Sequence, residues 1–591
     1  MVTNFFFFIS FVSFLSGLVL VYKVPEMVSL FRCVIICLIT ELCFGAVIVG
    51  IYSLVGAPIH LASLSIAYLI MGVTVWGIVA YQKKIQELEI SKVDIYSLFV
   101  IILWFLAVFI KVFTPSIENA YINSDPAVHY KNALRVLDTG RVSAMYFAET
   151  YNGLVMELFA PFVTRYSLLK PFILADSFAN LLNVFMFYCL IISFVQSKFV
   201  KIIIPLLSFL YFVGWPFNSY VAGGFVYFGW GVTLFAYVVY MLIKLYESRE
   251  RRSQIILLGL VLLGCFSVLV CYLLFIAILA PLVLISLIYV AKKNHMIVFG
   301  RRKTGICIAV LLMAIGVFSF CFWGFFHGDM IYVFDALKTD GGIAKELYQD
   351  FVFLIPAFFY MGWKYIKNKE INIIFITTGV ILVYIICTFL ICLSGIMSPY
   401  YYYKSYYLLW FFTWIMTIEF IDYLFQKDKV LLFSYGGTLL FAIFITLSGV
   451  DSALERKGIV IDDSSVLVYS SPFPIWDRME QFFVMDQYLE DKHALIDLSR
   501  YINDEFSEEE KIPMLGDVYF LNMWYNSYTN NSGIYITSDE LFADSIEECK
   551  KAGYQYIAVY QNMKRYWDNK ELLNGYENVY DNGYYGIYML Y

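Results

Sequence analysis

The residues best suited to chemistry in this sequence lie in one polar stretch, YINSDPAVHYKNALRVLDTG, at 121–140. Helical spacing places Asp125, His129 and Asn132 on one face of this stretch, so that a carboxylate, an imidazole and an amide point the same way. Such a set can transfer protons or bind a metal ion. Because the surrounding sequence is strongly apolar, this chemistry is predicted to take place at a membrane surface.

The element that positions these residues is predicted to be a short amphipathic helix. Asp125-Pro126 is typical of a helix start, with an acidic N-cap followed by proline at the first helical position. Gly140 is typical of a left-handed C-terminal cap. The opposite, apolar face carries Tyr130, Leu134 and Leu137. An ordinary capped helix has the same pattern, so the rest of the chain must decide between the two interpretations.

The composition is that of a polytopic membrane protein. Of the 591 residues, 61% are hydrophobic and 15% are charged, whereas soluble domains have about 45–50% apolar and about 25% charged residues. Residues 451–591 contain 25 acidic and 11 basic residues, a net charge of −14, while residues 1–450 carry +8. This change predicts a passage from lipid to water near residue 450. No disulfide framework in the tail and no CxxC pair for zinc is seen.

Fourteen stretches are apolar enough to cross a bilayer, which requires about 20 residues each. They lie at 4–22, 33–55, 60–81, 95–113, 172–195, 202–221, 225–243, 255–271, 273–291, 305–326, 350–366, 371–394, 406–425 and 430–450. The N-terminal MVTNFFFFIS lacks the basic region of a cleaved signal peptide and is predicted to stay in place as the first span. The predicted fold class is therefore an α-helical polytopic membrane protein with about 14 spans.

Lysine and arginine are unevenly distributed between alternate loops. One set of loops carries 21 basic residues and the opposite set carries eight. Because positively charged loops stay inside, we expect both termini, the polar stretch at 121–140 and the acidic tail to be extracytoplasmic. The chain is thus predicted to be a multi-pass protein of the cell membrane.

The outer loops concentrate the polar residues. The largest, 114–171, contains the helix described above and a second amphipathic stretch, Tyr151–Tyr166, so two helices are expected in the interface plane. The loop 327–349 carries His327 and Asp329. The short loop SPYYYYKSYY, at 398–407, surrounds one lysine with six tyrosines at the membrane edge.

The tail from Asp451 is predicted to be an extracytoplasmic α/β domain. Helices are expected near 486–506, 518–527 and 540–552, and strands at 512–517, 533–537 and 556–560. A closing hairpin is expected around Asn582-Gly583. The alternation favours a Rossmann-like sandwich. Because the tail has neither GxGxxG after a strand nor a Walker A sequence, no nucleotide is assigned to it.

The layout resembles the GT-C superfamily of integral-membrane glycosyltransferases, which use a sugar carried on a polyprenyl phosphate. The resemblance rests on SDPAVHY at 124–130, GGFVYFGWG at 223–231, YYYYKSYY at 400–407 and the tail ending GYQYIAVY…YENVYDNGYYGIYMLY. The chain departs from the family in having three extra spans before the acidic loop and no adjacent acidic pair within it. The resemblance implies N-terminal transmembrane helices at 1–94, a catalytic core at 95–450 and a soluble domain at 451–591.

Transfer of a sugar from a lipid phosphate requires a base for the acceptor hydroxyl and a cation for the departing phosphate. Asp125 is the candidate base, and His129 can orient it, bind phosphate or ligate a metal. Lys404 is the candidate partner of the phosphate, with Tyr400 and Tyr403 lining the passage of the prenyl chain. Simpler alternatives are a plain N-cap, a hydrogen-bonding histidine and an aromatic belt with a snorkelling lysine.

Further residues are weaker candidates. Arg135 can assist with the phosphate, although a solvated charge on the helix explains it more simply. Glu118 is a candidate second carboxylate. His327 and Asp329 are candidates to complete the site or to lie in an ordered lid. A divalent cation such as Mg or Mn would need oxygen ligands, and the spacing does not establish one.

The sequence therefore predicts a membrane glycosyltransferase that transfers a sugar from a polyprenyl-phosphate-linked donor to a glycan, lipid or protein acceptor on the outer face. A flippase or transporter of lipid-linked sugars is the alternative, although Glu41 is the one acid well placed within a span and no internal repeat is seen. A membrane polysaccharide polymerase, also acting in the cell envelope, is a near neighbour. No feature predicts binding of nucleic acid.

Overall fold

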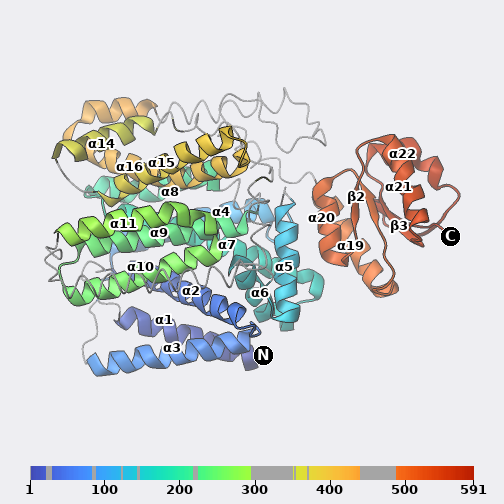
Figure 1. Ribbon diagram of the computed structural model, residues 1–591, viewed down its shortest axis with the longest axis horizontal. Helices are drawn as coiled ribbons and strands as arrows, with labels where there is room; N and C mark the ends of the chain where they lie inside the picture. The colour runs from blue at the N-terminus through green and yellow to red at the C-terminus, as the bar shows by residue number, and fades with distance from the viewer. Residues whose placement is uncertain are drawn as a thin grey trace.

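The computed structural model describes residues 2–21, 29–82, 88–121, 124–142, 147–216, 224–293, 338, 351, 354–368, 372–438 and 488–591. Figure 1 shows a bundle of long helices with a small α/β domain at one end. Helix α5 runs across the ends of the bundle helices, between them and this domain (Figure 1). The polar stretch, predicted to lie at the membrane interface, therefore lies between the helical bundle and the α/β domain.

The bundle is built from long apolar helices. Their bounds are α1 (Val2–Val21), α2 (Leu30–Leu54), α3 (Leu61–Gln82), α4 (Lys92–Phe113), α7 (Leu169–Ile192), α8 (Lys198–Pro216), α9 (Val226–Glu247), α10 (Arg251–Cys271), α11 (Ile276–Lys293), α14 (Ile355–Asn368), α15 (Ile373–Leu393) and α16 (Pro399–Lys427). Ten helices within the described residues are long and apolar enough to cross a membrane. The prediction of a polytopic helical membrane protein is confirmed, whereas the number of fourteen spans and the orientation stay predictions.

The four predicted spans outside these ten have different outcomes. The stretch 202–221 corresponds to α8, and 350–366 corresponds to α14, which has only 14 residues. The stretch 305–326 lies outside the described residues, and 430–450 lies partly outside them. The long apolar run after residue 255 divides as predicted, because α10 ends before Tyr272 and a 3₁₀ turn, η4 (Leu273–Phe275), precedes α11.

Two amphipathic helices follow α4, as predicted for the loop 114–171. The first, α5 (Asp125–Thr139), has Ser124 rather than Asp125 at its N-cap, since Asp125 already begins the helix. Gly140 ends α5 in the left-handed conformation with φ 63°, as predicted. The predicted bounds of the second helix, 151–166, are wrong. This helix, α6 (Phe147–Phe159), starts earlier and gives way to the 3₁₀ turns η1 (Ala160–Phe162) and η2 (Arg165–Leu168), because Pro161 has no N–H to continue it.

The N-terminal helices, whose role the sequence leaves open, brace the two interfacial helices. In the connection between α2 and α3, the Ile59 N–H donates to the Gly140 carbonyl at 2.7 Å. The Leu61 N–H, at the start of α3, donates to Glu157 of α6 at 3.0 Å. His60 lies so close to Gly140 that a β-carbon there would overlap with the imidazole. The first helices therefore fix the C-terminal end of α5 and the body of α6.

The C-terminal residues form a domain around a five-stranded sheet with the order β2-β1-β3-β5-β4. Strand β1 pairs in parallel with β2 and β3, while β5 pairs antiparallel with β3 and β4. The elements are α19 (Leu489–Glu505), β1 (Met514–Gly516), α20 (Tyr519–Thr529), β2 (Gly533–Tyr535), α21 (Asp539–Lys551), β3 (Tyr556–Tyr560), α22 (Lys564–Asn569), β4 (Glu577–Asp581) and β5 (Tyr585–Met589). The hairpin of β4 and β5 turns at Asn582-Gly583, as the sequence predicts.

Helix α20 of this domain packs on the face of α5 that carries Ala127, Tyr130 and Lys131. Ser527 Oγ donates to the Ala127 carbonyl at 2.7 Å, and Lys131 Nζ donates to Asn526 Oδ1 at 2.8 Å. The Tyr130 ring lies 5.8 Å from the Trp524 ring. By helical spacing this is the face opposite Asp125, His129 and Asn132. The C-terminal domain therefore packs on the face of α5 opposite the candidate site residues.

Candidate active site

The N-terminus of α5 carries the predicted carboxylate, and the GGFVYFGWG segment supports it. Asp125 is half-buried and is followed by Pro126 in the first turn. Gly224, just before α9, packs against the Pro126 ring in a backbone conformation with φ 65°. A β-carbon at residue 224 would overlap with that ring. Only glycine combines this positive φ with so close an approach.

Lys404 lies in the second turn of α16 and is buried, with 4% of its surface exposed. Its ammonium nitrogen lies among four aromatic rings, which we call the aromatic cage: Tyr400 at 4.1 Å, Phe225 at 5.0 Å, Tyr227 at 5.6 Å and Phe228 at 5.8 Å from the ring centres. Ring faces within about 6 Å attract a cation. The cage thus surrounds the amino group of Lys404 with ring faces in a site from which most water is excluded.

Asp125 and Lys404, which the sequence assigns to two distant loops, are neighbours in the structure. Gly224 packs against Pro126, the residue that follows Asp125. The next residue, Phe225, has its ring centre 5.0 Å from Lys404 Nζ, so this segment brings the start of α5 close to Lys404. A base for proton transfer therefore lies beside a cation that can hold an anionic leaving group. This is the pairing that transfer from a sugar phosphate requires.

His129 lies one turn after Asp125 and forms a buried pair with Glu149 of α6. His129 Nδ1 and Glu149 Oε1 are 2.8 Å apart, and the same oxygen accepts a 2.8 Å hydrogen bond from Asn132 Nδ2. Glu149 is 2% exposed. With the carboxylate as acceptor, Nδ1 carries the proton and Nε2 presents a lone pair. The predicted alignment of Asp125, His129 and Asn132 on one face of α5 is present, and Glu149 holds two of its three members.

Tyr227 joins the two halves of the site. Its ring meets the His129 ring edge-on, with the centres 4.6 Å apart, and also contributes to the cage around Lys404. On its other side it stacks on Tyr272 at 5.8 Å. The groups contributed by α5, α6, α9 and α16 are therefore in one continuous cluster.

The other predicted site residues lie in different surroundings. Arg135 is exposed on α5, and Tyr403 is half-buried beside Tyr402. Glu118 faces the C-terminal domain, where its Oε2 lies 3.5 Å from His493 Nε2. The predicted residues His327 and Asp329 lie outside the described residues.

A divalent cation at this site stays an open prediction. Across the described ranges, no group of three or more His, Cys, Asp and Glu side chains is placed to hold a metal ion. The carboxylate of Glu149 already accepts two hydrogen bonds.

Sequence reasoning missed Glu149 and the aromatic residues of the cage that precede and begin α9. Glu149 falls just before the stretch 151–166 predicted as a helix, so its position on a helical face was not considered. Phe225, Tyr227 and Phe228 belong to the GGFVYFGWG segment, which the resemblance singles out without giving it a role. The signal was present in that segment, but the partner of each ring depends on tertiary packing.

Comparison with solved structures identifies proteins of similar fold. The structure of ArnT from Cupriavidus metallidurans bound to undecaprenyl phosphate aligns with a TM-score of 0.50 at 10% sequence identity, over 83% of this chain and 98% of that chain. This chain shares the fold of ArnT. The apo state of ArnT aligns over the same shares with a TM-score of 0.50 at 11% identity. No protein-family model and no curated protein matches the sequence.

The match to ArnT supports the predicted architecture of a polytopic helical membrane protein, and the resemblance to the GT-C superfamily stays a prediction. Because the alignment covers 83% of the chain, it includes more than the transmembrane bundle alone. The low identity restricts this conclusion to architecture, so the roles of individual residues rest on the geometry described above.

Proposed function

We propose that this protein is a membrane glycosyltransferase that moves a sugar from a polyprenyl-phosphate carrier to an acceptor hydroxyl. The transfer takes place at the outer face of the cell membrane. The observation that carries the proposal is that the segment Gly224–Phe225 contacts both Pro126, next to Asp125 at the start of α5, and Lys404 of α16. The fold supports it, since ArnT has been crystallised with undecaprenyl phosphate. The acceptor is a glycan, lipid or protein, and no nucleic acid takes part.

The proposed reaction is a displacement at the anomeric carbon. The acceptor oxygen forms a bond to that carbon while its proton passes to the Asp125 carboxylate. The bond between the anomeric carbon and the phosphate oxygen breaks, and both electrons leave with the phosphate. Lys404 stabilises the charge that develops on that oxygen, in a cage that requires little reorganisation during the reaction. The products are the glycosylated acceptor and polyprenyl phosphate.

His129 and Glu149 are proposed to orient the reacting groups. Glu149 fixes the imidazole of His129 through Nδ1, so that Nε2 can accept a hydrogen bond from a sugar or acceptor hydroxyl. Tyr227 holds the other edge of the imidazole ring and keeps it close to the cage. In this assignment His129 positions the substrate and Asp125 takes the proton.

The test is transfer of radiolabelled sugar from a panel of polyprenyl-phosphate sugars by purified protein. We expect wild-type protein to transfer sugar and Asp125→Asn to lose about 100-fold or more of the rate, as is typical when a general base is removed. The matched control is Asp138→Asn, the same change on an exposed carboxylate of α5 that pairs with Arg165 at 3.0 Å. Equal transfer by wild type and a stable Asp125→Asn protein would remove Asp125 as the base. Absence of transfer, together with movement of lipid-linked sugar across proteoliposomes, would instead indicate a flippase.

A further inference from the structure

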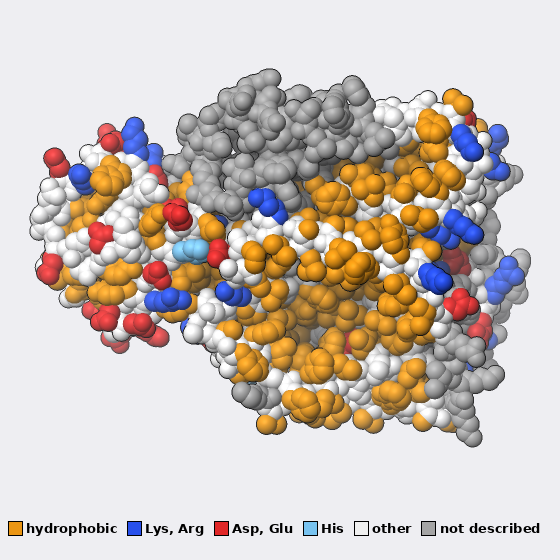
Figure 2. Space-filling model, turned by 180° about the vertical axis from the view of Figure 1, so that it is seen from behind, with side chains coloured by type: hydrophobic (Ala, Val, Ile, Leu, Met, Phe, Trp, Pro, Cys, Tyr) orange, Lys and Arg blue, Asp and Glu red, His pale blue; other side chains and the backbone are white. Residues whose placement is uncertain are grey.

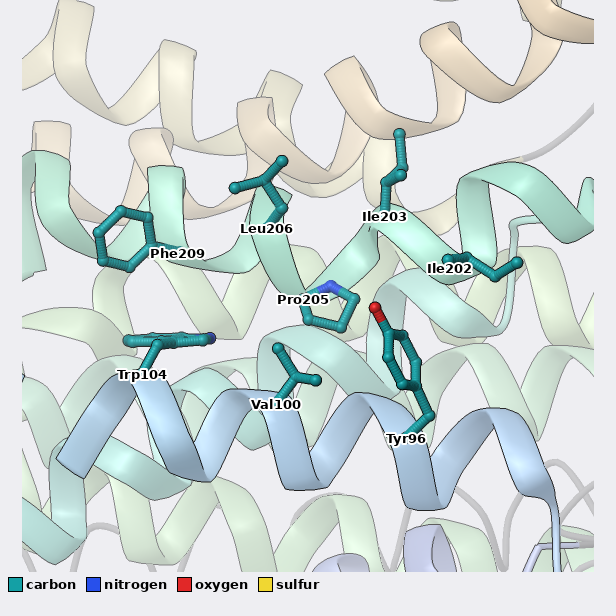
Figure 3. Close-up of a pocket in the computed structure, with 8 residues that line it drawn as sticks. All are labelled: Tyr96, Val100, Trp104, Ile202, Ile203, Pro205, Leu206 and Phe209. Atoms are coloured by element: carbon teal, nitrogen blue, oxygen red, sulfur yellow. The ribbon is translucent and has the colours of Figure 1, made fainter. Parts of the chain in front are cut away.

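A groove separate from the active site lies between α4 and α8 (Figure 3). It has a volume of about 370 Å³. The lining residues are Tyr96, Val100 and Trp104 of α4 and Ile202, Ile203, Pro205, Leu206 and Phe209 of α8. Ile202 and Leu206 are exposed, so the groove opens to the outside of the bundle. In a membrane this outer surface faces lipid hydrocarbon.

The sequence explains why the two helices leave a groove at this place. Val100 and Pro205 face each other at its centre, and both are small compared with the residues at its ends (Figure 3). At one end, the Trp104 ring meets the Phe209 ring edge-on at 5.4 Å and closes the groove. Tyr96 lies at the other end (Figure 3). The groove is thus a slot that is closed deep in the bundle and open toward the first turns of α4 and α8.

The length of the slot matches one leaflet of a bilayer. Tyr96 and Trp104 are eight residues apart on α4, which corresponds to about 12 Å at about 1.5 Å per residue. One hydrocarbon leaflet is about 15 Å thick. Because α4 continues from Phe113 toward α5, its first turn lies at the membrane face opposite the active site. The slot therefore belongs to the other leaflet from the one that meets Asp125 and Lys404.

Three lysines lie at the open end of the slot. Lys92 is one helical turn before Tyr96 on α4, and Lys198 is one turn before Ile202 on α8, so each lies above a lining residue. Lys201 directly precedes Ile202. None of the three lysines forms an ion pair with a described carboxylate. Figure 2 shows Lys and Arg side chains gathered at the end of the bundle away from the C-terminal domain, beyond a largely hydrophobic surface.

The acidic groups near this end leave the lysines available. Asp422 of α16 accepts hydrogen bonds from the Gln196 and Ser197 N–H groups, at 3.0 and 2.9 Å, and so caps α8. Asp94 is buried and pairs with Arg32 at 3.0 Å. Asp94 and Asp422 are thus committed to other partners. Glu89, three residues before Lys92, is exposed and offsets one of the three lysine charges.

We propose that this slot binds one acyl chain of an anionic glycerophospholipid, whose phosphate is held by Lys92, Lys198 and Lys201. The chain fits an apolar slot of leaflet depth, and the charge at its mouth is complementary to an anionic headgroup. The α-carbon of Tyr96 lies about 6 Å further along α4 than that of Lys92, because four residues rise about 1.5 Å each. From that position the Tyr96 hydroxyl can donate a hydrogen bond to an ester carbonyl, which a glycerophospholipid has and a polyprenyl phosphate lacks.

The first test counts lipids retained by the purified full-length protein in native mass spectrometry, with phosphatidylglycerol and phosphatidylcholine offered together. We expect wild type to retain phosphatidylglycerol preferentially. Two variants, the triple Lys92→Gln/Lys198→Gln/Lys201→Gln and the slot-filling Val100→Trp, are expected to lose that preference by roughly 10- to 100-fold. The matched control is Lys364→Gln/Lys367→Gln/Lys427→Gln, which removes the same charge from other helices at the same membrane face.

The second test locates the bound chain by fluorescence. Phosphatidylglycerol with brominated acyl chains is expected to quench Trp104 in wild type, and Trp104→Phe is expected to remove that part of the quenching. Equal retention of the two lipids by wild type, or an equal loss in the control triple variant, would overturn the proposal and indicate annular lipid only. Unchanged quenching in Trp104→Phe would overturn it as well, since the chain would then lie elsewhere.

Discussion

Gly224 packs directly against Pro126, the residue that follows Asp125 in α5. This contact connects the segment before α9 with the helix that carries the proposed base. The same segment supplies Phe225 and Tyr227 to the cage around Lys404. A single backbone approach therefore fixes the relative positions of the two charges on which the proposed reaction depends.

Replacing Gly224 by alanine is expected to reduce sugar transfer by about 100-fold, because misplacement of a reacting group by about 1 Å has effects of that size. The new β-carbon would overlap with Pro126, and a positive φ costs a residue other than glycine about 1–3 kcal/mol. The measurement is the transfer rate together with thermal stability. The control is Gly379→Ala on α15, where a β-carbon meets open space. Full activity in Gly224→Ala would show that this contact does not set the geometry.

Replacing Lys404 by methionine is expected to lower the transfer rate by about 100- to 1,000-fold, the usual effect of removing a group that stabilises developing charge. Methionine keeps most of the packing volume within the aromatic cage, so a folding defect is expected to be small. The measurement is the single-turnover rate at saturating donor. Lys111→Met, at the exposed end of α4, makes the same change outside the site and should leave the rate unaltered.

The local sequence predicts several features of this arrangement, whereas the contacts between distant segments cannot be predicted from it. The face of α5 with Asp125 and His129 follows from helical periodicity, and the turn at Asn582-Gly583 follows from the φ values that this pair adopts readily. The partner of His129 does not follow, because Glu149 reaches it only through the packing of α6 against α5. The predicted N-cap is wrong by one residue, because the helix includes Asp125 and Ser124 precedes it with φ −78° and ψ −29°.

The docking of the C-terminal domain shows the same limit on a larger scale. Its helices and strands lie close to their predicted positions, since their hydrophobic periodicity is local. No local pattern indicates that Ser527 donates to the Ala127 carbonyl, or that Trp524 lies against Tyr130. The sequence places the domain on the same side of the membrane as α5, and only the structure shows that it supports α5 directly.

Substitutions in the pair of His129 and Glu149 are expected to change the free energy of unfolding. His129→Ala would remove one of the two described hydrogen bonds to a carboxylate that is 2% exposed, and loss of a partner for a buried polar group costs about 1–3 kcal/mol. The double variant His129→Ala/Glu149→Gln removes the charge and should be more stable than the single variant. Denaturant unfolding in detergent measures both. For comparison, Arg165→Ala should cost about 0–1 kcal/mol, because its pair with Asp138 is exposed. A double variant less stable than His129→Ala would contradict the argument.

Lys492 of α19 connects the C-terminal domain to the segment before α5, so its replacement is expected to affect the active site. Its buried ammonium donates to the Tyr121 carbonyl at 2.7 Å, a short distance before α5 begins. Lys492→Met should leave that carbonyl without its donor, at a cost of about 1–3 kcal/mol. We expect faster hydrogen exchange at the start of α5 and slower sugar transfer. Lys511→Met is the control, since Lys511 bonds only locally, to the Glu508 carbonyl at the surface of the same domain. Equal rates of hydrogen exchange at the start of α5 in the two variants would show that the Lys492 contact does not stabilise the active site.

The burial of Glu157 in α6 is expected to make the stability of the fold depend on pH. Burial raises the pKa of its carboxyl above the ordinary value of 4.5, while the hydrogen bond from the Leu61 N–H and the nearby His60 lower it in part. A group whose pKa is raised on folding stabilises the fold below its unfolded pKa. That contribution is lost as the pH rises through the raised pKa, because the buried carboxylate must then carry its charge.

Glu157→Gln should therefore be as stable as wild type at about pH 4 and more stable at about pH 8, since glutamine keeps an oxygen for the Leu61 N–H and never ionises. The measurement is the midpoint of thermal unfolding for both proteins across this range. Glu157→Ala separates the two effects, because it removes the acceptor as well as the charge and should be destabilising at every pH. A wild-type protein that gains stability over Glu157→Gln as the pH rises would show that the carboxylate is favoured in the folded state. In that case the hydrogen bond from the Leu61 N–H, together with His60, would outweigh burial in setting the pKa of the Glu157 carboxyl.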